Sequence, residues 1–338
     1  MGIKGTPYYY HAVLKRISPQ AAPPFEDEDM QERVWGRRWG TYNDVGRLRL
    51  VLLHRPGDEL KIYSEDKYDP SIEALIDDEE QWYFRSDTAP NILKMQEEHD
   101  GLARALVEND VVIEHVDCSP QDPNAMMVRD AAIAVKGGAV ICRMAMVGKK
   151  HGSGRRIEER YVTKKLVELG MPIIRTIHGQ GLFEGGSFCF LDEQHAVIGL
   201  GYRQNQEGAD QIRNVMLHQG VEVIDVPLVG HSLHIDKAIV MVDHDKALVN
   251  VALLPFWFLD RLKELGIQAI DVDPRDSEMA NNCLAVAPGR ILMCEGSDWT
   301  ADRLCEMGME VTLIPYDECH KNGGGIHCST LPLIRDRD

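Results

Sequence analysis

Long apolar runs are missing from this chain of 338 residues. No window approaches the roughly eighteen uncharged apolar residues of a membrane-spanning helix, and residues 1–20 contain no apolar core of a secretory signal. The sequence therefore predicts neither membrane association nor secretion. With 44% hydrophobic and 27% charged residues, the chain can bury a large core, and we expect a globular protein in the cytoplasm.

Paired cysteines are missing as well. The eight cysteines contain no C-x-x-C pair, and several of them, such as Cys142 and Cys189, lie in apolar runs. Such usage is typical of free buried thiols in a reducing compartment and indicates neither a disulfide framework nor a zinc site. We therefore predict that the protein requires no metal and no organic cofactor for its activity.

Positive charge is scarce. Lys and Arg together number 37 against 54 Asp and Glu, which gives a formal net charge of -17. Nucleic acid is a poor partner for such a chain, because phosphate binding needs a basic surface. A small cationic ligand fits better, although acidity that only maintains solubility is the simpler explanation.

A G-x-G-x-x-G motif after a strand is also absent, and a different pattern is present. From about Asn43 onward the chain repeats a β-hairpin, a helix and a short apolar strand, with a period of roughly fifty residues. The pattern predicts hairpin turns at 136–138, 192–194, 243–245 and 288–290, helices over 156–169, 209–218, 255–265 and 300–307, and strands over 172–177, 221–226, 267–272 and 311–315.

A fifth unit completes the pattern if residues 47–54 pair with residues 329–334, with a helix over 92–106 and a strand over 111–116. Pairing the two ends would close a ring, so we predict an α/β fold that forms a five-bladed, pseudo-symmetric α/β propeller of ββαβ-like repeats. Loops around the centre would then carry the functional side chains. An open doubly wound sheet is the alternative, which the many hairpins disfavour.

The start of the chain differs from the remainder. Residues 20–24 are rich in alanine and proline, and residues 25–29 are rich in acidic side chains, which indicates a loop or a mobile arm. We predict an N-terminal arm over 1–42 and one catalytic domain over 43–338, and we expect a homo-oligomer.

Three consecutive glycines, Gly323, Gly324 and Gly325, precede the sequence Ile-His-Cys that ends at Cys328. Glycines let the backbone adopt positive φ and approach a ligand closely, at a cost in ordering entropy that a structural loop has little reason to incur. Cys328 is therefore a candidate nucleophile. A structural thiol is the alternative, because most free cysteines pack in cores.

A cysteine nucleophile needs an acid–base partner that a third group holds in place. Equivalent loop positions of the repeat offer Asp130, Glu184, His234 and Asp236. Each of these has a structural explanation by itself, as part of a turn, a cap, an ion pair or a hydrogen-bonded core histidine. Their recurrence at matching places of the repeat favours a catalytic site.

At these loops the sequence resembles the guanidino-group-modifying enzymes, which include arginine deiminases, dimethylargininases, agmatine deiminases and amidinotransferases. The shared motifs follow the family's order and are Asn124-x-x-x-x-Arg129-Asp130, Phe183-Glu184-Gly185-Gly186, His234-Ile235-Asp236 and Gly323-Gly324-Gly325-Ile326-His327-Cys328. The resemblance covers nearly the whole chain from Asn43 onward. It implies the pentein fold, a five-bladed α/β propeller, in agreement with the repeat.

The resemblance implies a role for each matched residue. Cys328 would attack the guanidinium carbon and form a covalent thiouronium, while His234 would protonate the leaving amine and later activate water. Glu184 would hold His234, and Asp130 and Asp236 would bind guanidinium N–H groups. Carboxylates around the guanidinium would localise its charge, because the delocalised cation has a poorly electrophilic carbon. The same carboxylates would raise the pKa of the Cys328 thiol in the empty site.

Further matches concern the remainder of the substrate. Arg203 matches a carboxylate-binding arginine of arginine deiminases, Asn124 resembles an asparagine that contacts the amino-acid end, and Gly325 belongs to the nucleophile loop. Arg156, or its neighbour Arg155, stands near a second carboxylate-binding position. A salt-bridged helix surface is an equally good explanation of that pair.

We therefore predict a cysteine-dependent hydrolase, of deiminase or dihydrolase type, that acts on the guanidino group of arginine or an arginine derivative. Its partner would be a small cationic or zwitterionic guanidino substrate, with no nucleic acid and no membrane. Ser187 replaces the Asp that usually follows Glu-Gly-Gly in arginine deiminases, which leaves recognition of the substrate's α-amino end unassigned. We interpret residues 82–85 as a packed loop, with a substrate lid as the alternative.

Three other functions are alternatives to this prediction. An amidinotransferase, in which an amine replaces water in the second step, is the alternative within the family. A non-catalytic binding protein on the same fold would have no evident need for the cysteine, the histidine and the carboxylates together. A Cys-His-Asp peptidase is disfavoured, because the paired aspartates would oppose the negative charge of an oxyanion.

Overall fold

Five three-stranded sheets form the centre of the molecule, whose computed structural model describes residues 3–148 and 154–337. In each sheet the first two strands are antiparallel, and the third strand runs parallel to the second. The sheets are β18–β1–β5 (Leu331–Arg335, Leu48–Leu53, Val112–His115), β6–β7–β8 (Ala132–Val135, Gly138–Ile141, Ile173–Thr176), β9–β10–β11 (Phe188–Phe190, His195–Leu200, Glu222–Pro227), β12–β13–β14 (Ile239–Asp243, Lys246–Val249, Gln268–Asp271) and β15–β16–β17 (Leu284–Ala287, Arg290–Cys294, Glu310–Ile314).

A helix joins the second strand of each sheet to the third, because parallel neighbours need a long crossover. Apolar faces of these helices pack on the sheets, as Val162 and Leu166 do beside Ile141 in one buried cluster. The predicted repeat of hairpin, helix and strand is confirmed, with element ends displaced by a few residues. The helices are α3 (Ile92–Glu108), α4 (Arg156–Leu169), α5 (Gln206–His218), α6 (Phe256–Glu264) and α7 (Asp298–Glu306).

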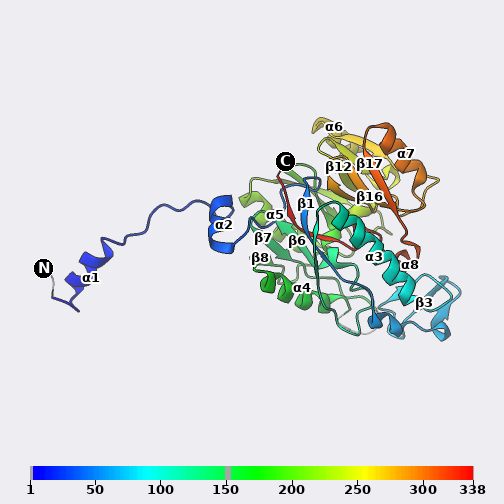
Figure 1. Ribbon diagram of the computed structural model, residues 1–338, viewed down its shortest axis with the longest axis horizontal. Coiled ribbons are helices and arrows are strands. Elements are labelled where there is room, and N and C mark those ends of the chain that lie inside the picture. The colour runs from blue at the N-terminus through cyan, green and yellow to red at the C-terminus, as the bar shows by residue number, and fades with distance from the viewer. Residues whose placement is uncertain (1–2, 149–153, 338) are drawn as a thin grey trace.

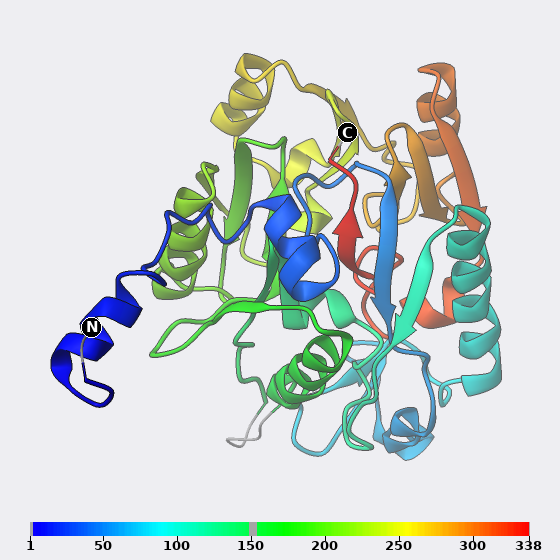
Figure 2. The same cartoon turned by 60° about the vertical axis from the view of Figure 1, so that its left-hand side comes forward.

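The two ends of the repeat meet in one sheet. β1 lies between β18 and β5, with Leu52 opposite Leu331 (Figure 2). The predicted pairing of residues 47–54 with 329–334 is therefore confirmed. First and second strands also connect neighbouring sheets: β18 contacts β6, β9 contacts β12, β12 contacts β15 and β15 contacts β1.

Three short 3-10 turns precede the first strands of three successive sheets, and they position the site. They are η3 (Val128–Ala131), η4 (Gly185–Ser187) and η5 (Ile235–Lys237), and η4 contacts both of the others. Asp130 and Asp236 belong to these turns and are buried. The turns thus bring chemically active side chains from distant parts of the chain to the same end of their sheets.

Smaller elements lie between the repeats. The carboxylate of Glu98 on α3 accepts hydrogen bonds from the backbone N–H groups of Glu318 and Cys319, both at 2.9 Å, and so fixes the start of the segment that leads to Cys328. The smaller elements are η1 (Asp58–Ile62), η2 (Glu65–Lys67), the antiparallel sheet β2–β3–β4 (Tyr68–Asp69, Ala74–Ile76, Tyr83–Phe84), η6 (Val251–Leu253) and α8 (Asp317–His320).

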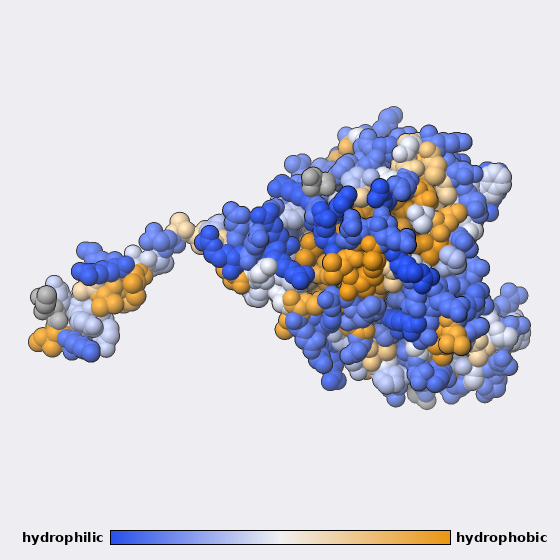
Figure 3. Space-filling view, viewed as in Figure 1, coloured by the Kyte–Doolittle hydropathy of each residue, from blue (hydrophilic) through white to orange (hydrophobic). Residues whose placement is uncertain are grey.

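Two helices precede the repeat, α1 (Pro7–Leu14) and α2 (Glu28–Trp35). α1 projects from the body on an extended segment (Figure 1), and none of its residues, all of which are described, is buried. Apolar atoms are visible on its surface (Figure 3). Trp39 and Thr41, in contrast, are buried, and the Thr41 hydroxyl donates to the Ala134 carbonyl at 2.9 Å. The boundary at residue 42 between an N-terminal arm and the catalytic domain stays a prediction.

None of the helices in the described part of the chain combines the length and the apolar character that a membrane crossing requires.

Candidate active site

The glycine loop before Cys328 packs too closely for larger residues. Gly323 has a φ of 101°, and a Cβ there would lie 2.6 Å from the Tyr83 hydroxyl oxygen. A Cβ on Gly324 would lie 2.5 Å from the sulfur of Met127. Both the backbone angle and the neighbouring side chains therefore require glycine at this turn, as the sequence suggested.

The Cys328 thiol is buried, with 7% of the residue exposed. Its sulfur accepts a hydrogen bond from Nδ2 of Asn282 at 3.0 Å, and its backbone N–H donates to Oδ1 of the same side chain at 3.1 Å. The thiol in turn faces Oδ2 of Asp236 at 3.7 Å. Burial raises the pKa of Cys328 well above its ordinary value, and the charges of Asp236 and Asp130 raise it further.

His234 connects two carboxylates. Its Nε2 lies 2.7 Å from Oε2 of Glu184, and its Nδ1 lies 3.4 Å from Oδ1 of Asp130. Burial by itself would lower the pKa of His234, but the carboxylates of Asp130 and Glu184 outweigh it and raise that pKa. Burial likewise opposes ionisation of Glu184, yet its hydrogen bond to His234 lowers the pKa of the glutamate to about 2. These pKa directions favour an imidazolium at His234 and a carboxylate at Glu184.

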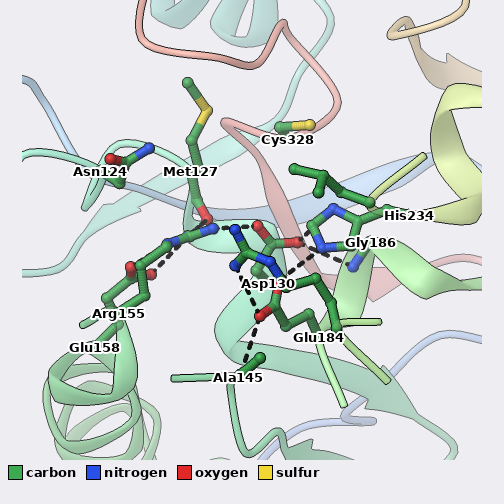
Figure 4. Close-up of polar contacts among 12 residues, drawn as sticks. Asn124, Met127, Asp130, Ala145, Arg155, Glu158, Glu184, Gly186, His234 and Cys328 are labelled. Atoms are coloured by element: carbon green, nitrogen blue, oxygen red, sulfur yellow. Dashed lines mark hydrogen bonds and ion pairs between the residues drawn. The ribbon is translucent and has the colours of Figure 1, made fainter. Parts of the chain in front are cut away.

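Two arginines, the buried Arg155 and the partly buried Arg203, compensate these negative charges. Arg155 donates to Oδ2 of Asp130 at 2.6 Å and to Glu158 at 2.8 Å, while Arg203 donates to Oε1 of Glu184 at 3.3 Å. Asp130 consequently lies between Arg155 and His234 (Figure 4). Among the described residues, Nε of Arg203 has no hydrogen-bond partner, so this guanidinium has donor capacity left for a ligand.

Asp236 lies behind the nucleophile and is 1% exposed. Oδ2 accepts a hydrogen bond from Nδ1 of His327 at 2.9 Å. Burial raises the pKa of Asp236, but this hydrogen bond reverses the effect and lowers it overall. Burial also lowers the pKa of His327, so this imidazole donates as a neutral ring. Oδ1 of Asp236 has no hydrogen-bond partner within the described chain, which leaves one acceptor beside the thiol.

These groups surround a cavity whose atom-free space, including its open mouth, is about 600 Å³. Trp82 and Tyr83 line it, so the loop 82–85 is both packed and part of the wall. Lys237, directly after Asp236, also lines the cavity. The wall thus combines carboxylates and cations, which suits a substrate that carries both charges.

Most of the predicted residues meet at this cavity. Asp236 contacts the nucleophile from behind, whereas Gly325 faces Asn282 instead of the cavity. Arg156 is also absent from the wall, because its Nε donates to the Met144 carbonyl at 2.7 Å, and its neighbour Arg155 occupies the wall instead. Predicted residues that line the cavity are Asn124, Asp130, Glu184, Arg203, His234 and Cys328.

Sequence reasoning missed Asn282, which holds the nucleophile through two hydrogen bonds. A signal for it existed. Asn282 lies just before β15, the first strand of the fifth sheet, as Asp130 lies just before β6 and Asp236 just before β12. Glu158 and Lys237 were also missed, because each lies within a charged stretch that gives no distinguishing pattern.

Asp130, Glu184 and His234 could in principle hold a metal, since one ligand atom of each lies within 4.8 Å of the others. Both carboxylates already face guanidinium groups, Asp130 that of Arg155 and Glu184 that of Arg203. A divalent ion would have to replace or approach these cations. The arrangement therefore fits a metal poorly, and the expectation that catalysis needs none stays a prediction.

A model of the family described as "Arginine deiminase" matches residues 119–256 and 261–335, which is more than half of the chain. The chain belongs to the arginine deiminase family. The resemblance to guanidino-group-modifying enzymes that the motifs indicated is confirmed.

Individual relatives are distant. An N(G),N(G)-dimethylarginine dimethylaminohydrolase of Pseudomonas aeruginosa is 24% identical over 242 residues, which cover 72% of this chain and 89% of that protein. A 2-nitroimidazole nitrohydrolase of a Mycobacterium species is 25% identical over 333 residues, which cover 90% of this chain and 84% of the relative.

Solved structures show the fold. The Pseudomonas aeruginosa dimethylarginine enzyme superposes with a TM-score of 0.66 at 21% identity, covering 85% of this chain and 100% of its own. SxtG, an amidinotransferase from Microseira wollei, superposes with a TM-score of 0.65 at 15% identity, covering 88% of this chain and 97% of its own. The family member described here thus has the α/β pentein fold of these proteins.

Proposed function

We propose that this protein hydrolyses a C–N bond in the guanidino group of arginine or an arginine derivative, with Cys328 as the nucleophile. The observation that carries the proposal is the buried thiol at 3.7 Å from Asp236, on the wall of a cavity shared with the His234–Glu184 pair. An empty site with these carboxylates disfavours a thiolate. A bound guanidinium would cancel the negative charge of these carboxylates, so the thiol would be activated only when substrate is present.

The proposed first step forms a covalent intermediate. Binding of the cation releases the thiol proton to solvent, and the Cys328 thiolate adds to the guanidinium carbon. The protonated His234 then donates its proton to the leaving nitrogen, the C–N bond breaks, and ammonia or an amine departs. The carbon remains bound to sulfur as a thiouronium, which Asp236 and Asp130 stabilise electrostatically.

The proposed second step uses water. The neutral His234 removes a proton from a water molecule as its oxygen adds to the thiouronium carbon. The C–S bond then breaks, the urea product is released, and Cys328 and His234 return to their initial protonation states. Glu184 holds the imidazole in both steps through its 2.7 Å hydrogen bond to Nε2.

The other end of the substrate would meet cations. Arg203, Lys237 and Asn124 line the same cavity, so we assign the two cations to a substrate carboxylate and Asn124 to the amino-acid end of the substrate. Arg155 is compensated by Asp130 and Glu158, so we assign it to orienting Asp130. This charge pattern favours arginine-like zwitterions over simple amines that carry a guanidino group.

We also propose that the five sheets close into a five-bladed propeller. Support comes from the contacts of β18 with β6, of η3 with η4, of β9 with β12, of β12 with β15 and of β15 with β1, which link each sheet to the next. The cavity would then lie at one end of the central axis.

An amidinotransferase is the second candidate, supported by the similarity of fold to SxtG. The first half-reaction is common to both, and only the acceptor differs. Incubation with arginine, with and without glycine, separates them: citrulline and ammonia support the hydrolase. Ornithine that forms only when glycine is added supports the transferase, and no product from arginine or from methylated arginines contradicts both.

A further inference from the structure

A second cluster of metal-ligand side chains lies away from the proposed reaction site. His54 follows β1 directly, Glu59 belongs to η1, and Cys118 lies in the connection after β5. One ligand atom of each residue lies within 4.8 Å of the other two. His54 and Glu59 are buried and Cys118 is partly exposed, so an ion could reach the cluster from the side of the thiol.

The hydrogen bonds of His54 leave one ring nitrogen for a ligand. Nδ1 lies 2.8 Å from the Val116 carbonyl oxygen and must donate its proton there. In the neutral ring that a metal would bind, Nε2 would carry the lone pair, and this nitrogen lies 3.4 Å from Oε1 of Glu59. The same carboxylate oxygen accepts the Gly57 N–H at 2.6 Å. Backbone groups therefore orient both the imidazole and the carboxylate, as they do around metal ligands.

This geometry differs from that of a catalytic triad. In a catalytic triad the nucleophile and the carboxylate occupy opposite nitrogens of the imidazole. Here Val116 occupies Nδ1, so the carboxylate of Glu59 and the thiol of Cys118 must share the Nε2 side. Three potential ligand atoms that lie within 4.8 Å of one another suit a single central ion better than proton transfer along a chain.

We propose that His54, Glu59 and Cys118 form a zinc site. An imidazole, a thiolate and a carboxylate are the three protein ligand types that zinc uses, and the sulfur disfavours magnesium and calcium. Zinc–ligand distances of about 2.0–2.3 Å place neighbouring donors of a tetrahedral site roughly 3.3–3.6 Å apart. The distance of 3.4 Å between Nε2 and Oε1 falls within that range.

Asp122 provides an independent indication of a missing ligand. It is fully buried, and within the described chain neither of its carboxylate oxygens has a hydrogen-bond partner. Asp122 and Cys118 line one small cavity. A buried carboxylate without a partner is costly unless something compensates it. An ion beside Cys118 would supply the charge, either directly or through a bound water.

The site would hold three segments together. It joins the end of β1 and η1 to the connection that continues through Asn124 to η3 and Asp130. Zinc would therefore stabilise one wall of the cavity without contacting the reacting atoms. This role does not depend on the proposed function, because the ion would bind equally well in a protein whose reaction is different.

The test uses the full-length chain with Cys328→Ser as the background, which removes the thiol of the proposed reaction site. Metal-free protein is titrated with Zn²⁺ by calorimetry and with Co²⁺ by absorption, since a thiolate ligand gives Co²⁺ a near-ultraviolet charge-transfer band. We expect one equivalent bound per chain, this band, and a higher melting temperature with Zn²⁺.

Two further variants in that background locate the ion. Adding Cys118→Ser should abolish the cobalt band and weaken zinc binding by at least about 100-fold, because loss of even an outer partner costs 10–100-fold. Cys305→Ser, at an exposed cysteine outside both clusters, is the matched control and should change neither. If Cys118→Ser fails to fold, Glu59→Gln gives the same comparison for zinc affinity.

Two results would overturn the proposal. One is substoichiometric zinc binding without a cobalt–thiolate band in the Cys328→Ser background, which would leave His54 and Glu59 as an ion pair only. The other is a band and a zinc affinity that survive Cys118→Ser and Glu59→Gln, which would place the ion elsewhere.

Discussion

At the scale of single residues, the site is organised around a thiol that its surroundings keep protonated. Burial and the carboxylates of Asp236 and Asp130 all raise the pKa of Cys328. The amide of Asn282 is the opposing influence, because its N–H donates to the sulfur. Under the proposed mechanism, a thiol held in this way would be inactive towards chance electrophiles until a cation enters.

Replacing Asp236 by Asn should lower the pKa of Cys328, since one repelling charge disappears, even though substrate binding weakens. Alkylation rates with a small uncharged reagent, followed against pH, measure this thiol pKa. In the parent protein the value should be no lower than the reference of about 8.5. A low thiol pKa that rises in Asp236→Asn would instead indicate a preformed ion pair between Cys328 and His234.

Replacing Glu184 by Gln should lower the pKa of His234, because the hydrogen-bonded negative charge that helps to raise it is removed. His234 must be protonated to release the leaving amine, so activity is lost as the pH rises through its pKa. The alkaline limb of the kcat profile should therefore move to lower pH in Glu184→Gln. An unchanged limb would exclude His234 as the proton donor.

Only one of the cysteines should matter for the reaction. Cys328→Ser should reduce kcat by more than about 10⁴-fold, as loss of the nucleophile does in enzymes that form covalent intermediates. Cys142→Ser and Cys189→Ser are matched controls, because both thiols are buried outside the cavity, and they should affect at most stability. Comparable loss of activity in folded Cys142→Ser would remove the special role of Cys328.

At the scale of elements, the repeat was predictable because short polar or glycine-containing turns between apolar runs alternate with helical periodicity. The small sheet β2–β3–β4 was not, since strands of two or three residues are too short for an alternating pattern. Glycines 323–325 were recognised as special, but their physical reason is tertiary: Tyr83 and Met127 come from other segments. Asn282 could have been found only by comparing loop positions between repeats.

The glycine loop gives a prediction at this scale. The Gly323→Ala variant should lose more free energy of unfolding than the about 1–2 kcal/mol that a left-handed backbone costs an alanine. The additional loss is expected because the new Cβ also clashes with the Tyr83 hydroxyl. Gly308→Ala is the matched control, since its φ is +87° and a Cβ would meet no described atom within 4 Å. Urea unfolding measures both, and adding Tyr83→Phe should recover part of the excess. Equal losses at both glycines would contradict the clash.

At the scale of the whole molecule, strands from the two ends of the repeat pair with each other. β18 lies against β1, and Arg335 at its end donates to the Gly46 carbonyl at 2.8 Å. The N-terminal helix α1 contributes nothing comparable, because none of its residues is buried. This pairing was predictable from two apolar strands left without partners, whereas the placement of α1 and α2 had no counterpart in the repeat.

Deleting residues 1–24 should therefore change the free energy of unfolding by less than about 0.5 kcal/mol, as expected for surface changes. Deleting residues 331–338 should prevent folding, because β1 would lose its antiparallel neighbour. Denaturant unfolding followed by circular dichroism compares the two. A large loss of stability in the first deletion would show that α1 packs on the domain or on a second copy.

The central claim is that Cys328 becomes covalently bonded to the guanidino carbon of the substrate. Its most direct test is acid quenching of the protein during turnover of arginine or its ω-methylated forms, followed by intact mass measurement and peptide mapping. Arginine and the forms methylated on one terminal nitrogen only should leave the same adduct on the peptide that contains Cys328, because the methylated nitrogen departs with the leaving amine, and Cys328→Ser should show none. Turnover by Cys328→Ser, or an adduct on another residue, would contradict the account.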